Sequence, residues 1–214
     1  MRCAIYPPTI RLSTFASGDI VIDLYAWTSA NGRRPIIMLE ETGTPYRITP
    51  IDPHSEERNT PAYRKVSPGG KVPCLVDPDG PGGAPLHLME SSAILMYLGD
   101  KTGRFMGADA AGRWDVLQWL LYQATNVAIS FSALNVTRDM EPQCRNLLDV
   151  LNTHLADRDY FAGDYSIADM MSIGRFGKFA FDYIDLNEYP NLCRWRDRVM
   201  DRPAVRKATE MAIV

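Results

Sequence analysis

Thr28, Ser29 and Asn31 lie in a polar loop of small residues, just before a segment with helical periodicity. The N-terminus of a helix presents free N–H groups and a partial positive charge, so it stabilises an anion placed there. A hydroxyl or amide that donates a hydrogen bond to sulfur favours the thiolate, because bonding to the charged form lowers a pKa. The loop therefore predicts a site that activates an incoming thiol, with Thr28, Ser29 and Asn31 as catalytic candidates. The alternative is that Ser29 and Asn31 only cap the helix.

Glu90 and Ser91 open another helical segment and form a second candidate site. Ser91 and its backbone N–H can hold a carboxylate at the start of the helix, while Glu90 can pair with an ammonium group. A ligand that carries both an α-amino and an α-carboxylate group fits this pair. The alternative is that both residues serve only as a cap and as partners of the helix dipole.

A third candidate is the peptide bond between Val72 and Pro73, which precedes the short apolar run Cys74-Leu75-Val76. Proline cannot donate to a sheet, so Pro73 is expected at the first residue of a strand. Only an X-Pro bond adopts cis at low cost, and a cis bond here would turn the N–H and C=O of Val72 outward. An extended peptide could then pair with Val72 as an added strand. The alternative is an ordinary trans proline at the start of a strand.

The composition is that of a globular protein, with 214 residues and a net charge of −3 at pH 7. The absence of a strong positive charge argues against nucleic acid or an anionic membrane as a partner. The four cysteines form no metal-binding spacing and the three histidines are isolated, so we expect reduced thiols, no metal and a cytoplasmic location. No apolar run reaches the ~18 residues of a membrane span. Residues 1–19 lack the apolar core of a secretory signal and are interpreted as an N-terminal extension.

The positions of turn residues divide the first half of the chain into strands and helices. Strands are predicted at 20–25 and 45–52, with a helix at 33–42 between them, and this βαβ unit requires parallel strands. A short helix at 61–66, an antiparallel hairpin of strands at 73–76 and 86–88, and a helix at 90–103 follow. The order βαβαββα over 20–103 predicts an α/β thioredoxin-like N-terminal domain with a mixed four-stranded sheet.

The second half of the chain has helical periodicity and no strand signal. After a linker at 104–112, residues 113–214 are expected to form an all-helical C-terminal domain. Ser166 and Asp169 have the spacing of a capping box before the apolar run 170–181. The other predicted helices start near 113 and span 141–155, 189–200 and 203–211.

These motifs, taken in order, resemble a soluble glutathione transferase of the cytosolic superfamily. The resemblance covers roughly residues 20 to 210 and rests on Ser29 and Asn31, Lys71-Val72-Pro73, the run from Glu90 to Leu98, and the run from Ala162 to Asp169. The strand Asp23-Leu24-Tyr25, the Asn31-Gly32 step and Lys71-Val72-Pro73 are most similar to the bacterial nu class.

The resemblance implies a role for each candidate residue. Glutathione would bind to the first domain, with its cysteinyl backbone paired to Val72 beside a cis bond to Pro73. Its γ-glutamyl end would contact Glu90 and Ser91. The remaining assignments place Lys71 and Arg58 at the glycine end, Asn31 near the thiol, and Ser29 facing the sulfur with Thr28 as the adjacent alternative.

The resemblance also implies an enzyme that binds glutathione as a co-substrate and uses its thiolate on a small electrophile or a disulfide. The alternatives within the family are a glutathione-dependent disulfide-bond oxidoreductase and a non-catalytic binding or regulatory protein. A homodimer is expected, joining the N-terminal domain of one subunit to the helical domain of the other. The identity of the second substrate does not carry over, because residues 124–138 depart from the nu-class pattern.

Overall fold

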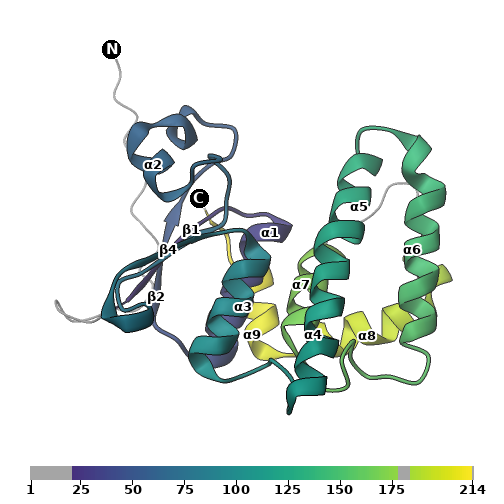
Figure 1. Cartoon of the computed structure of the whole chain (residues 1–214). Coiled ribbons are helices and arrows are strands. Elements are labelled where there is room, and N and C mark those ends of the chain that lie inside the picture. Colours follow the sequence, from purple (N-terminus) through teal and green to yellow (C-terminus); the bar gives the residue numbers. More distant parts are fainter. Residues whose placement is uncertain (1–20, 178–183, 214) are drawn as a thin grey trace.

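The computed structural model describes residues 21–177 and 184–213, which fold into a sheet-containing half and a helical half (Figure 1). The strands of the first half are β1 (Ile22–Ala26), β2 (Tyr46–Pro50), β3 (Cys74–Asp77) and β4 (Leu86–Met89). They are arranged in the order β2-β1-β3-β4. Strand β1 runs parallel to β2 and antiparallel to β3, and β3 runs antiparallel to β4. The predicted parallel βαβ unit, the hairpin and the thioredoxin-like fold are therefore confirmed.

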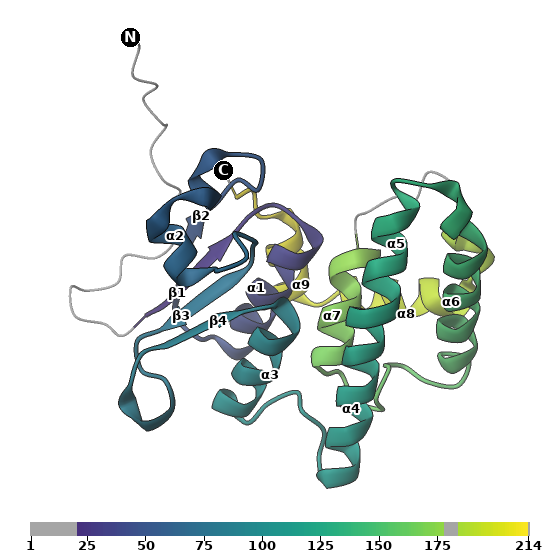
Figure 2. The ribbon, with the colours of Figure 1, turned by 45° about the horizontal axis from the view of Figure 1, so that its top comes forward.

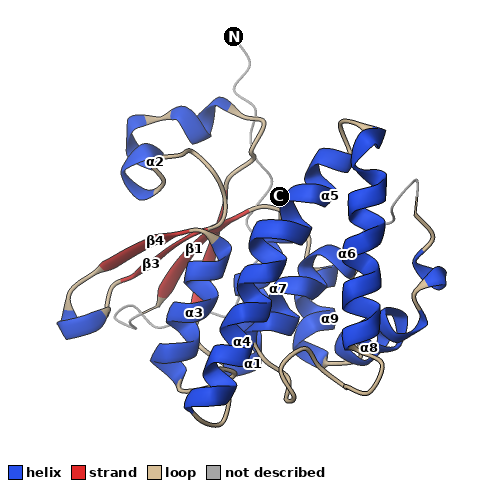
Figure 3. Cartoon of the chain, turned by 45° about the vertical axis from the view of Figure 1, so that its right-hand side comes forward, coloured by secondary structure: helices blue, strands red, loops and turns tan. Residues whose placement is uncertain are grey.

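The helices of this half are α1 (Ala30–Thr42), α2 (Pro61–Val66) and α3 (Ser91–Thr102). Figure 3 shows α1 and α3 on the face of the sheet that meets the helical half, and α2 on the other side. Helix α1 begins at Ala30 rather than at the predicted Arg33, because the Ser29 hydroxyl accepts a hydrogen bond from the Gly32 N–H at 3.1 Å.

The second half contains helices and no β-strand among the described residues. Its α-helices are α4 (Ala110–Tyr122), α5 (Ala128–Leu134), α6 (Glu141–His154), α7 (Ile167–Phe176), α8 (Pro190–Met200) and α9 (Pro203–Glu210). A π-helical turn, Gln123–Val127, joins α4 to α5. Short 3₁₀ turns lie at Glu56–Asn59, Pro81–Gly83, Arg138–Met140 and Leu186–Glu188. The sequence pattern predicted the helices at 141–155, 189–200 and 203–211 and missed α5.

Helix α1 makes the most extensive contacts between the two halves, and α3 also packs against α7. Helix α1 packs against α3 on its own side and against α7 and α9 of the helical half (Figure 2). Ile36, Ile37 and Leu39 are buried in a hydrophobic core that continues across both halves. At the far end of α1, the guanidinium of Arg202 donates to both carboxylate oxygens of Glu41, at 2.6 and 2.9 Å. The two halves are thus fixed to each other along the whole of α1.

Two expectations fall outside the described residues. The predicted N-terminal extension, residues 1–19, lies there, and so does the part of the predicted helix 170–181 beyond Gly177. In the parts of the chain that are described, no helix is both long and apolar enough to cross a membrane.

The predicted capping box at the start of α7 is present and is buried. The Ser166 hydroxyl accepts from the Ala168 N–H at 3.3 Å, and the Asp169 carboxylate accepts from the Ser166 N–H at 2.9 Å. The second oxygen of Asp169 accepts from Trp195 Nε1 at 2.8 Å and from the Phe161 N–H at 3.1 Å. Burial raises the pKa of Asp169 to about 6, and these hydrogen bonds oppose the rise. One carboxylate thus joins α7, α8 and the loop before α7.

We predict that Ser166→Ala lowers the free energy of unfolding by about 1 kcal/mol, because the helix loses its side-chain cap. Asp169→Asn should cost more, since an amide offers one acceptor oxygen where the carboxylate uses two. Urea unfolding of both variants measures the difference. A Ser166→Ala protein as stable as the unmodified one would show that the cap contributes nothing to folding.

Candidate functional site

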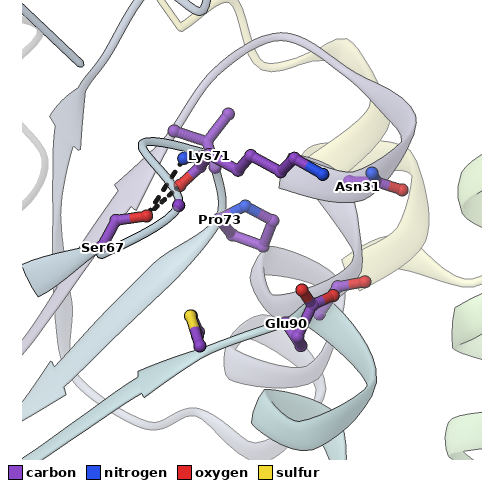
Figure 4. Close-up of a pocket in the computed structure, with 9 residues that line it drawn as sticks. Asn31, Ser67, Lys71, Pro73 and Glu90 are labelled. Atoms are coloured by element: carbon purple, nitrogen blue, oxygen red, sulfur yellow. Dashed lines mark hydrogen bonds between the residues drawn. The ribbon is translucent and has the colours of Figure 1, made fainter. Parts of the chain in front are cut away.

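A pocket at one edge of the sheet brings together most of the predicted site residues (Figure 4). It encloses about 140 Å³. The predicted residues that line it are Asn31, Lys71, Val72, Pro73, Glu90 and Ser91. Its other lining residues, Ser67, Gly69 and Met89, were not among the predicted site residues. Thr28, Ser29 and Arg58 are not among the lining residues.

The segment before β3 forms one wall of the pocket. The Val72–Pro73 bond is cis, as predicted. Within the described residues, neither the N–H nor the C=O of Val72 has a hydrogen-bond partner, so both remain available to an extended peptide. Pro73 itself is buried against the sheet.

The backbone of Lys71 is held by three side chains while its ammonium group extends into the pocket. The Ser67 hydroxyl donates to the Lys71 carbonyl at 2.9 Å and accepts from the Lys71 N–H at 3.0 Å. The Tyr63 hydroxyl donates to the same carbonyl at 2.8 Å, and the Cys74 thiol does so at 3.4 Å. Burial raises the pKa of both Tyr63 and Cys74, so each stays a neutral donor at pH 7. Figure 4 shows the Lys71 and Asn31 side chains reaching toward the same space.

The N-terminus of α1 forms the second wall. Ser29 is the N-cap and accepts the Gly32 N–H, which leaves its hydroxyl hydrogen free to donate elsewhere. The carbonyl oxygen of Asn31 accepts from Arg34 Nη1 at 2.5 Å, so its amide nitrogen faces away from Arg34. Figure 4 shows that nitrogen on the side of Lys71. Capping by Ser29 is therefore compatible with the predicted thiol-binding role.

Thr28 has a different environment from its neighbour. Its hydroxyl donates to the carbonyl of Ile213 at 3.0 Å and accepts from the N–H of Ile213 at 2.9 Å. Because the single hydroxyl hydrogen is used in this contact, it is not available to a ligand. Thr28 thus joins the loop before α1 to the segment after α9.

The start of α3 forms the third wall. Glu90 precedes the helix with φ = 70°, a left-handed conformation that costs a non-glycine residue about 1–3 kcal/mol and is enriched at binding sites. Its carboxylate makes no cap hydrogen bond, so Glu90 does not cap α3 through its side chain. Ser91 is 7% exposed, and its hydroxyl accepts from Arg34 Nη1 at 3.1 Å.

The charges of the pocket favour a ligand with one cationic and several anionic groups. Lys71, the Asn31 amide, the Ser91 hydroxyl and the N-termini of two helices are donors. Glu90 supplies a carboxylate among them. Among the described residues, no cluster of three or more His, Cys, Asp or Glu side chains could hold a metal ion.

The structure differs from the sequence prediction at two arginines. Arg58 lies on the exposed 3₁₀ turn Glu56–Asn59 and does not line the pocket, so its contact with a ligand stays a prediction. Arg34 was not considered, although it contacts two pocket residues. A signal for it existed, since Arg34 stands on the same face of α1 as the buried residues Ala30 and Ile37.

Comparison with known proteins places the two halves in one family. Residues 28–101 match the model "Glutathione S-transferase, N-terminal domain", and residues 135–203 match "Glutathione S-transferase, C-terminal domain". The disulfide-bond oxidoreductase YfcG of Escherichia coli is 32% identical over 88% of this chain and 94% of its own. The disulfide-bond oxidoreductase YghU of the same organism is 30% identical over 91% of this chain and 76% of its own.

Comparison with solved structures indicates the same family. A glutathione transferase from Burkholderia graminis, with two glutathione molecules bound per subunit, superposes with a TM-score of 0.85 at 31% identity, covering 89% of this chain and 88% of that one. One from Pseudomonas putida, with one glutathione disulfide bound per subunit, has a TM-score of 0.85 at 29% identity, covering 92% and 94%. Both halves match models of one family, the identity extends over nearly the whole chain, and the architecture is shared. The protein therefore belongs to the glutathione S-transferase family, in which it is similar to the bacterial nu class.

Proposed function

We propose that the protein is an enzyme that binds glutathione in this pocket, stabilises its thiolate and uses the thiolate on a second substrate. The observation that carries the proposal is the polarity of the pocket, where one carboxylate, Glu90, stands among donors. Glutathione has the matching pattern. Its γ-glutamyl ammonium fits Glu90, its γ-glutamyl carboxylate fits Ser91 and the start of α3, and its glycine carboxylate fits Lys71.

The thiol of the bound tripeptide would lie at the N-terminus of α1. With the cysteinyl backbone paired to Val72, the sulfur is directed toward Ser29 and Asn31, whose hydroxyl and amide hydrogens are free to donate. These donors and the positive end of the helix dipole stabilise the thiolate over the thiol, so the thiol pKa falls. The thiolate is the nucleophile. Thr28 supports this loop through Ile213 instead of acting on the sulfur.

The second substrate that we favour is a disulfide. The thiolate attacks one sulfur of R–S–S–R, the S–S bond breaks, and RS⁻ leaves with the bonding electron pair. A second glutathione thiolate then attacks the mixed disulfide, giving glutathione disulfide and the second RS⁻. The loop from Trp27 to Gly32 contains no cysteine, so glutathione itself and not the protein forms the mixed disulfide. The names of the two Escherichia coli relatives support this choice over conjugation to an electrophile.

We further propose that the protein is a homodimer in which α4 meets the partner's sheet-containing half. Trp114 and Leu121 are 71% and 49% exposed, and their spacing of seven residues places them on one face of α4. Ile129 on α5, the next α-helix along the chain, is 61% exposed. Large apolar side chains grouped in this way mark an interaction surface.

We expect Ser29→Ala to lower glutathione-dependent reduction of 2-hydroxyethyl disulfide by about tenfold or more, since a hydrogen bond to a charged group is worth about 1.5–3 kcal/mol. Glutathione affinity, measured by calorimetry at a pH below the bound-thiol pKa, where the ligand binds as the neutral thiol, should change less than turnover. Thr28→Val is the matched control. It should lower stability by about 1–2 kcal/mol through two lost hydrogen bonds and leave the thiol pKa unchanged. Unchanged turnover in Ser29→Ala would remove Ser29 from the chemistry, and binding without any turnover in the wild type would favour a regulatory protein.

Glu90→Gln tests the γ-glutamyl end of the site. The neutral amide cannot form an ion pair with the ligand ammonium, so the dissociation constant for glutathione should rise about tenfold, or about 1.4 kcal/mol. A glutathione analogue that lacks the γ-glutamyl amino group should bind both proteins alike. An equal loss for both ligands would mean that Glu90 acts on the fold and not on the ammonium.

The proposed dimer can be tested by introducing a charged side chain into its interface. Leu121→Arg should convert a dimer into a monomer at micromolar concentration in sedimentation velocity, because burying an unpaired guanidinium is strongly unfavourable. Val150→Arg is the control, since Val150 lies on α6, is 39% exposed and is not part of the proposed interface. A monomeric wild type, or a dimer that survives Leu121→Arg, contradicts the assignment.

A further inference from the structure

Arg34 is a buried cation directly behind the pocket. Its side chain is on α1, the residue is 2% exposed, and within the described chain it forms no salt bridge with a carboxylate. Its Nε donates to the carbonyl of Met171 on α7 at 2.9 Å. Its Nη1 donates to the Asn31 carbonyl oxygen at 2.5 Å and to the Ser91 hydroxyl at 3.1 Å. One nitrogen therefore contacts a residue at each of two walls of the pocket.

The hydrogen bonds from Arg34 determine whether Asn31 and Ser91 present a donor or an acceptor to the pocket. A guanidinium has donors and no acceptor, so it binds only the acceptor atoms of its neighbours. The amide of Asn31 must then keep its oxygen on Arg34 and its NH₂ away from it. Ser91 likewise accepts from Arg34 and keeps its hydroxyl hydrogen for another partner. Without Arg34, each of these side chains could equally present an acceptor to the pocket.

The charge of Arg34 also lacks a counter-ion within the described protein. Burial, together with the nearby charge of Arg175 on α7, lowers the pKa of Arg34 to about 9, which leaves it protonated at pH 7. A buried and uncompensated charge is costly, and an anion in the adjacent pocket reduces that cost. The pocket is the neighbouring space in which such an anion can bind.

Close packing of α7 keeps the guanidinium in place. A Cβ built on Gly174 would lie 3.0 Å from Arg34 Cγ and 2.7 Å from the carbonyl of Ala30. A residue larger than glycine would push α7 away from Arg34 and from the first turn of α1. The orientation of Arg34 is therefore set from the helical half of the molecule.

We propose that Arg34 is a positioning residue that fixes Asn31 and Ser91 as hydrogen-bond donors, toward the thiolate and the γ-glutamyl carboxylate of glutathione respectively. The proposal rests on the proposed function. It makes one buried side chain, which does not line the pocket, responsible for orienting the donors to two anionic groups of the ligand. It also connects the two halves of the protein, since the same guanidinium is held by the Met171 carbonyl.

The test compares Arg34→Met, which removes every donor, with Arg34→Lys, which keeps the charge at a single point. The absorbance of the thiolate at 240 nm, measured against pH, gives the pKa of the bound thiol. Calorimetry measures the affinity for S-methylglutathione, which has no ionisable thiol and so reports on binding of the γ-glutamyl carboxylate. Arg34→Met should raise the bound-thiol pKa by about one unit or more and weaken S-methylglutathione about tenfold, as expected for loss of an oriented donor at each end. Arg34→Lys should recover part of both losses.

Arg202→Met is the matched control, because Arg202 is another arginine between the halves, bound to Glu41 at the opposite end of α1. It should lower the melting temperature and leave both ligand measurements unchanged. If Arg34→Met does not fold, Arg34→Lys decides the matter. A folded Arg34 variant with the wild-type thiol pKa and wild-type S-methylglutathione affinity overturns the inference. A wild type that binds neither glutathione nor S-methylglutathione overturns the proposed function instead, so the two failures are distinguishable.

Discussion

The burial of helix α1 between the sheet and the helical half is the interaction on which the rest of the structure depends. Its apolar residues Ile36, Ile37 and Leu39 are in the core, so the helix cannot shift without exposing them. The Ser29 cap fixes where the helix begins, and the Glu41–Arg202 pair fixes its other end to the segment before α9. Because the first turn of α1 is also a wall of the pocket, the packing that stabilises the fold positions the binding groups as well.

Most of the fold could be predicted from the sequence, because its signals are local. Strands of β-branched and aromatic residues, glycines such as Gly43 and Gly103 after the helices, and the Ser166–Asp169 cap all act within a few residues. The element that was missed, α5, lacks such a local signal. Helix α5 follows a π-helical turn at Gln123–Val127, and no local pattern distinguishes that turn from a continuous helix.

The site was predictable only in part, for a similar reason. Lys71, Val72, Pro73, Glu90 and Ser91 occur in short motifs, and the structure brings them to one pocket. The difference between Thr28 and Ser29 could not be seen in the sequence, because it depends on a backbone contact with Ile213, far along the chain. Arg34 was visible as a charge on an apolar helix face, but its partners Ser91 and Met171 belong to other helices.

The proposed role of Arg34 explains how two neutral side chains of the pocket, Asn31 and Ser91, can favour the anionic groups of a ligand. Asparagine and serine can each donate or accept, so alone they recognise a carboxylate no better than an ammonium. A buried guanidinium that occupies their acceptor atoms removes that ambiguity before any ligand arrives. The carboxylate of Glu90 forms no hydrogen bond with Arg34 among the described residues, so under the proposed function it stays available to the γ-glutamyl ammonium. Under the proposed function, specificity for a zwitterionic end beside a thiolate depends on Arg34 contacting Asn31 and Ser91 but not Glu90. Because Arg34 is held by α7, that specificity would depend on the whole fold and not on the pocket residues alone.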